Sequence, residues 1–143
     1  MALNTKKPIE ELKQILEAMN FFEKVSLGQP VEITKEESFP AVYINLDADI
    51  NEENGKMTGL SGREYDRMLM VTLKFNVNTD GSGELYHLDV RDKVEETILR
   101  DQPLWQHIID RTVEGSRWDK GASAPKREGE MGLVLFTRAD ILK

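Results

Sequence analysis

Apolar residues recur at helical spacing near the start of the chain. Between Ile9 and Met19 they fall every three or four positions, which is typical of an amphipathic helix. The opposite face is filled by charged and polar residues: Glu10, Glu11, Lys13, Gln14 and Glu17. Pro8 suits the first helical turn, where its missing N–H has no intrahelical partner. We therefore predict a helix that begins at Pro8 and ends near Asn20.

Three strand-like segments follow this helix. The segment from Val25 to Ile33 contains Gly28 and Pro30, which indicates a bent or edge strand. The segment from Ser38 to Leu46 is rich in β-branched and aromatic residues. The segment from Met68 to Val77 alternates between apolar and polar residues, the pattern of a strand with one buried face.

A second helix is predicted after a turn formed by residues 78–83. It extends from about Glu84 to Arg100, and its apolar face consists of Leu85, Leu88, Val94, Ile98 and Leu99. Asp80 or Ser82 is placed to cap its N-terminus, and Pro103 enforces its end.

The last third of the chain predicts a β-hairpin. A mainly polar strand from Ile109 to Trp118 is joined to a more apolar strand, from Met131 to Leu142, by a connector rich in glycine and proline. The resulting order is α-β-β-β-α-β-β. It predicts a single α+β domain over residues 1–143, with a mostly antiparallel sheet and two helices packed on one face.

Composition excludes several classes of function. The chain has 143 residues and no cysteine, so disulfides, thiolate metal sites and a cysteine nucleophile are excluded. Its net charge of −7, with Lys and Arg scattered among acids, argues against binding to nucleic-acid phosphates. No apolar run approaches the ~20 residues of a membrane helix, and no signal-peptide pattern follows the N-terminus. We expect no membrane association.

Candidate catalytic and metal-binding patterns each lack a required residue. The acidic segment that begins at Asp47 resembles a calcium loop, but its sixth and twelfth positions are Glu52 and Thr58 instead of Gly and Glu. His87 and His107 have no metal-ligand spacing, so structural roles are expected for both. We predict no cofactor, no metal and no enzymatic activity. The alternative is a small enzyme or ligand-binding domain that uses His87, Tyr86 and nearby acids.

Two unusual segments are candidates for contacts with other chains. The connection from Asp47 to Tyr65 exceeds the ~12–15 residues beyond which a loop without structure calls for a function. The strand from Ile109 to Trp118 carries charge on both faces, as at a sheet edge or a polar subunit interface. The candidate intersubunit or tube-contact residues are Asp47, Asp49, Met57, Leu60, Arg63, Tyr65, Arg67, Arg111, Arg117 and Trp118.

The order of apolar segments resembles a known family. A leading helix is followed by the strand Phe39-Pro-Ala-Val-Tyr-Ile44, a long variable connection and the strand Leu69-Met-Val-Thr-Leu-Lys-Phe75. A helix with Val94-Glu-Glu-Thr-Ile98 and a hairpin ending in Leu133-Val-Leu-Phe136 complete the pattern. Over nearly its full length the chain resembles the tail terminator (tail completion) proteins of long-tailed bacteriophages, the minor tail protein family.

This resemblance implies a structural virion protein. Such proteins form a ring, typically of six subunits, that caps the tail tube and joins it to the head–tail connector protein. The resemblance implies assembly in the host cytoplasm, a final place in the virion tail, and DNA that passes through the lumen without specific binding. It carries no catalytic residues, and it assigns intersubunit and tube contacts to long loops and sheet edges. Another head–tail joining (neck) protein is the alternative within this class.

Overall fold

The computed structural model describes residues 5–28, 40–58, 62–78, 85–119 and 126–141. Two helices and five strands occur in the predicted order α-β-β-β-α-β-β, so the predicted α+β class is confirmed. The elements are α1 (Lys6–Ala18), β1 (Lys24–Leu27), β2 (Ala41–Thr58), β3 (Gly62–Asn78), α2 (Tyr86–Leu99), β4 (Asp110–Trp118) and β5 (Lys126–Ile141).

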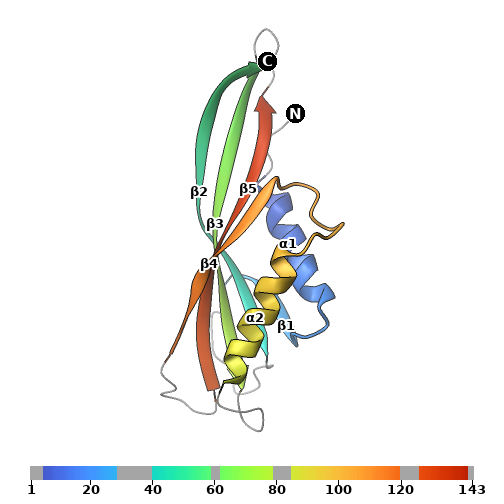
Figure 1. Cartoon of the computed structure of the whole chain (residues 1–143), viewed down its shortest axis with the longest axis vertical. Helices are drawn as coiled ribbons and strands as arrows, with labels where there is room; N and C mark the ends of the chain where they lie inside the picture. The colour runs from blue at the N-terminus through green and yellow to red at the C-terminus, as the bar shows by residue number, and fades with distance from the viewer. Residues whose placement is uncertain (1–4, 29–39, 59–61, 79–84, 120–125, 142–143) are drawn as a thin grey trace.

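The strands form one mixed sheet in the order β1-β2-β3-β5-β4. Every pairing is antiparallel except that of β1 with β2, which is parallel. Both helices lie along the same face of this sheet (Figure 1). The predicted mostly antiparallel sheet, with its helices on one face, is therefore confirmed. We call the opposite face, which no described helix covers, the open face.

The hydrophobic core lies between the helices and the sheet. Alternate residues of β3, from Leu69 to Val77, point toward the helices and are at most 2% exposed. They pack against Leu12 and Leu16 of α1 and against a stripe of α2 at helical spacing: Val90, Val94 and Ile98. Burying each such side chain stabilises the fold by about 1.5–3 kcal/mol. The core thus fixes which face of each strand remains available for contacts.

The predicted long loop between Asp47 and Tyr65 is wrong, because this segment is mostly strand. β2 and β3 continue as an antiparallel pair, with Glu52 opposite Asp66 and Met57 opposite Arg63. Together with β5 they extend beyond the helices (Figure 1). We call this three-stranded extension the arm: residues 50–58, 62–68 and 136–141. The sequence carries no strand signal here, because residues 51–58 and 62–67 are mostly polar and do not alternate between apolar and polar positions.

Several predicted boundaries are also corrected. β1 ends at Leu27, where Gly28 turns the chain at a φ of 77°, and residues 29–33 of the predicted strand lie outside the described residues. β5 begins at Lys126, so the end of the predicted connector belongs to a strand. α2 begins at Tyr86, and the predicted caps Asp80 and Ser82 lie outside the described residues.

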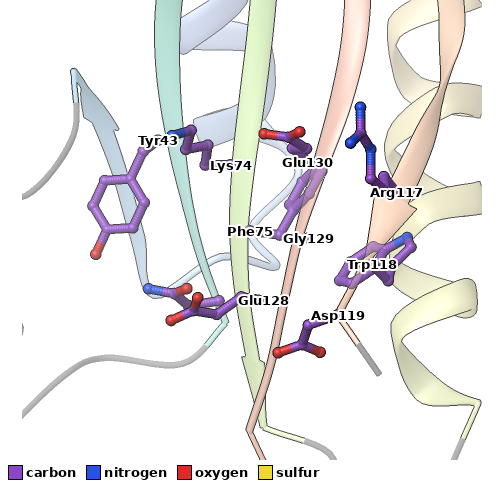
Figure 2. A pocket seen from close by; sticks show the side chains of 10 residues that line it. Tyr43, Lys74, Phe75, Arg117, Trp118, Asp119, Glu128, Gly129 and Glu130 are labelled. Carbon is purple, nitrogen blue, oxygen red and sulfur yellow. The ribbon is translucent and has the colours of Figure 1, made fainter. Parts of the chain in front are cut away.

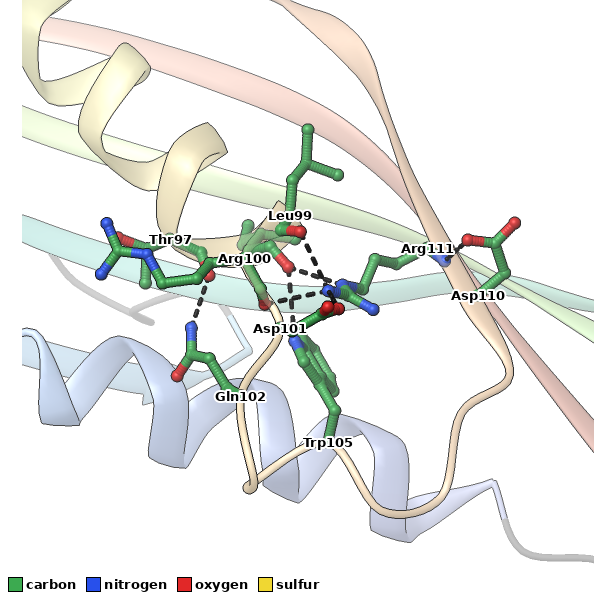
Figure 3. Close-up of polar contacts among 9 residues, drawn as sticks. Thr97, Leu99, Arg100, Asp101, Gln102, Trp105, Asp110 and Arg111 are labelled. Atoms are coloured by element: carbon green, nitrogen blue, oxygen red, sulfur yellow. Dashed lines mark hydrogen bonds and ion pairs between the residues drawn. The ribbon is translucent and has the colours of Figure 1, made fainter.

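The C-terminus of α2 is held by a side chain from β4. Arg111 donates through Nε to the carbonyl of Ile98 at 2.7 Å, and through Nη2 to the carbonyls of Leu99 and Arg100 at 2.9 Å (Figure 3). Its Nη2 also lies 3.3 Å from a carboxylate oxygen of Asp101. A cation there satisfies carbonyls that lack an intrahelical donor, and it complements the negative end of the helix dipole.

We predict that Arg111→Lys destabilises the fold by about 1–2 kcal/mol. Lysine keeps the charge but cannot place several donors in the fixed fork that reaches three successive carbonyls. The measurement is the free energy of unfolding in urea. Arg100→Lys is a matched control, because Arg100 makes only an exposed ion pair with Glu96. Equal losses in the two variants would contradict the capping role.

Candidate functional site

The structure distributes the predicted contact residues among three places. Five belong to the arm or its approach: Asp49, Met57, Arg63, Tyr65 and Arg67. Arg111 and Trp118 contact the helical side of the molecule. Asp47 and Arg117 lie at the open face, where Asp47 accepts a hydrogen bond from Thr72 and Arg117 lines a pocket. Leu60 lies outside the described residues.

The base of the arm is tied to the start of α1. Arg67 donates through Nε to the side-chain oxygen of Asn51 at 2.6 Å, and through Nη1 to the hydroxyl of Thr5. Asn51 and Arg67 are also opposite each other in the β2–β3 ladder. One guanidinium therefore connects both strands of the hairpin to the helical layer. Arg67 thereby fixes the base of the arm, and its contact with another chain stays a prediction.

The edges of the arm have no strand partner in the described part of the chain. β1 covers β2 only from Ala41 to Ile44. β4 covers β5 only as far as Phe136, so residues 137–141 of β5 have β3 on one side and no described strand on the other. Unpaired edges present rows of backbone N–H and C=O groups, which pair readily with a strand of another chain.

An apolar patch lies on the open face at the base of the arm. In the register of β2, β3 and β5 it consists of two adjacent rows: Ile50, Met68 and Phe136, then Ala48, Met70 and Val134. Ile50 is 45% exposed, whereas Val134 is 7% exposed. Apolar residues in one contiguous group on a sheet face are typical of an interaction surface.

A row of charged residues crosses the same face nearer the helices. Lys74, Glu130 and Arg117 occupy equivalent positions on β3, β5 and β4, and Figure 2 shows them side by side. They line an open pocket of about 450 Å³ that also includes Glu128 and Tyr43. Within the described residues none of Lys74, Glu130 and Arg117 makes an ion pair. This row has no signal in the sequence alone, because its members are adjacent only in the register of the three strands.

Trp118, which is half-buried, lines this pocket and packs on the helical side. Its ring stacks on Phe75, with centroids 5.6 Å apart and planes 18° apart, and meets His87 edge-on at 5.1 Å. Gly129 lies opposite Trp118 in the β4–β5 ladder. A Cβ at Gly129 would lie 2.7 Å from Cζ3 of Trp118 and closer still to other ring carbons. The absence of a side chain at Gly129 is therefore a packing requirement.

We predict that Gly129→Ala displaces Trp118 and destabilises the fold by about 1–3 kcal/mol. The indole is held between Phe75 and His87, so it cannot move aside without losing these contacts. The measurements are Trp118 fluorescence in a Trp105→Phe background and the free energy of unfolding. Gly132→Ala is a matched control, because a Cβ there would meet Glu114 at an ordinary 3.7 Å. An unchanged Trp118 spectrum in the Gly129 variant would contradict the packing described.

Both histidines are held by intramolecular contacts. His87 is 7% exposed, packs on Trp118 and does not line the pocket. His107 contacts the carboxylate of Glu11 through Nδ1, a pair that lies 96 positions apart in sequence. Within the described residues, these contacts give both histidines the structural surroundings that were predicted.

Glu11 was wrongly assigned to the exposed face of the first helix. It is only 7% exposed, and its Oε1 accepts hydrogen bonds from the backbone N–H groups of Gln106 and His107, both at 3.0 Å. The loop between α2 and β4 therefore folds onto α1 through one buried carboxylate. This contact carries no local sequence signal, because its partners are far apart along the chain.

In the described ranges, no three His, Asp or Glu side chains gather as metal ligands would. Neither described helix has the length and apolar character needed to span a membrane. No protein-family model matches the chain, and no curated protein matches it either. The functional conclusion therefore depends on the geometry of the arm, its edges and the open face.

Proposed function

We propose that the protein is a structural component of a phage-like tail that assembles as a ring of identical subunits. The observation that carries this proposal is the pair of uncovered edges on opposite sides of the projecting arm. Two different edges on one molecule allow a head-to-tail contact. The β2 edge of each copy then pairs with one neighbour, and its β5 edge pairs with the other. Such heterologous contacts generate a closed ring when the rotation between copies closes.

The strand directions specify how neighbouring arms would join. β2 and β5 are both antiparallel to β3, so they run in the same direction. In a ring with a single rotation axis, the β2 edge of one copy meets the β5 edge of the next in parallel. Parallel pairing is slightly less stable per residue than antiparallel pairing. Contacts elsewhere, or a template such as the end of a tail tube, would then support closure.

The position at the end of a tail comes from the resemblance of the whole chain to tail terminator proteins. In this role the ring, of about six copies in that family, caps the tail tube and contacts the head–tail connector protein, and DNA passes through its lumen. A net charge of −7 suits such a passage, because like charges keep DNA from binding to the wall. The confirmed order of helices and strands agrees with the pattern on which this resemblance depends.

Electron microscopy of the purified protein tests this function, alone and mixed with tail tubes of the same phage. We expect closed rings, and a cap at one end of each tube. Binding to the isolated head–tail connector without binding to tubes would instead indicate a neck protein. Particles that stay monomeric under both conditions would contradict the proposal.

A further inference from the structure

The open face has a self-complementary order of residues. β3 and β5 are adjacent, and their open-face residues form cross-strand pairs. Consider a second copy that faces the first and is related to it by a two-fold axis, parallel to the strands and midway between β3 and β5. Each open-face residue of β3 in one copy would then face, in the other copy, the β5 residue with which it is paired in the sheet. The pairs brought together in this way are Met68 with Phe136, Met70 with Val134, Thr72 with Gly132, and Lys74 with Glu130.

These pairings are chemically favourable. The apolar patch would pack on the apolar patch of the second copy, and Lys74 of each copy would face Glu130 of the other. Symmetry makes this ion pair twice. Within one described chain, Lys74 and Glu130 are neighbours in the ladder, yet neither makes an ion pair. Both charges are therefore available to a partner.

We propose that the open face is a second self-association surface, on which two copies of this chain pair face to face. An apolar centre with a charged row beside it is the usual composition of a protein interface. Two sheets that pack in this way lie about 10 Å apart. The contact is isologous, so it ends at two copies.

This pairing does not rest on the ring. The dimer uses the open face and leaves the edges of β2 and β5 uncovered, whereas the ring uses those edges. The two associations also differ in distance. In copies joined by their edges, the same residue of the two copies is separated by at least the width of the arm. In copies packed face to face, the same residue of the two copies lies about one sheet spacing apart if it is near the axis.

Cross-linking of a single introduced cysteine distinguishes these arrangements, since the native chain has no cysteine. Asn76 lies on the open face of β3, beside the proposed axis and opposite Glu128. Asn76→Cys treated with a bifunctional maleimide of about 10 Å span should give a covalent dimer. The control is Asp89→Cys, at an exposed position on the first turn of α2. A dimer yield no higher than that of the control would overturn the proposal.

A charge swap in the Asn76→Cys background tests the predicted partners. Lys74→Glu and Glu130→Lys should each lower the dimer yield about tenfold, because two attractive pairs become repulsive. The double variant should restore it, and the wild-type yield should fall at high salt. Asp89→Lys is the control for Glu130→Lys, because it makes the same change of charge on the helical side. Unaffected single variants, or a double variant that stays low, would overturn the proposed pairing, whether or not rings form.

Discussion

Removal of the arm should abolish ring formation and leave the domain folded. In this variant an Asn-Gly turn replaces residues 52–66, and the chain ends after Thr137. Asn51 and Arg67 are opposite each other in the ladder, so a two-residue hairpin turn can join them. The change removes most of the unpaired edges of β2 and β5 but none of the core residues. By light scattering we expect no particle larger than a dimer joined through the open face, at concentrations where the intact protein forms rings.

Two controls separate loss of assembly from loss of folding. The shortened protein should keep a cooperative unfolding transition, because the cluster that includes Leu69, Leu73 and Leu135 is intact. A tip-only variant, with Asn-Gly in place of residues 54–64, joins the paired Glu53 and Tyr65 and keeps part of each edge. It should assemble, but only at higher concentration. If the armless protein formed rings as readily as the intact protein, the arm would have no role in ring formation.

Glu11→Ala should destabilise the fold by about 2–4 kcal/mol, the largest loss expected from one substitution outside the apolar core. The carboxylate accepts two backbone N–H groups, from Gln106 and His107, and also contacts the His107 ring. Alanine would leave these donors without an acceptor in a partly buried place. The measurement is the free energy of unfolding in urea, with the slope of the transition checked for two-state behaviour.

Glu11→Gln distinguishes hydrogen bonding from simple packing. The amide oxygen of glutamine can still accept from Gln106 and His107, so the loss should be about 1 kcal/mol or less. Glu10→Ala, on the same helix, removes only an exposed ion pair with Lys6 and should change stability by less still. A Glu11→Gln variant as unstable as Glu11→Ala would contradict the acceptor role.

Burial of apolar residues was predicted well for β3 and α1 but only in part for α2. Of its predicted apolar face, Leu85, Leu88 and Leu99 are exposed, whereas Val94 and Ile98 are buried. The strict alternation from Met68 to Val77 identifies β3, and Leu12, Ile15 and Leu16 identify the buried side of α1. The arm has no such pattern, since residues 51–58 and 62–67 do not alternate between apolar and polar positions. The polar connection therefore resembled a loop.

The charged row on the open face and the cap of α2 are formed by residues far apart in sequence. Lys74 alone is an ordinary polar residue of a strand, and its position beside Glu130 and Arg117 follows only from the register of three strands. Arg111 is predicted to contact another chain, and within this chain its guanidinium also closes the end of α2. Charged residues on a strand can therefore serve contacts within the chain or contacts with another chain, and the sequence alone does not distinguish the two.

Native mass spectrometry across a range of concentrations tests the central claim most directly, which is that the chain assembles into a closed ring through the edges of its arm. We expect a discrete ring mass, a fixed multiple of the 16.4 kDa chain, whose population rises with concentration and which is absent from the armless variant. A monomer at every concentration, with and without tail tubes, would contradict it. So would a continuous series of masses without a preferred size.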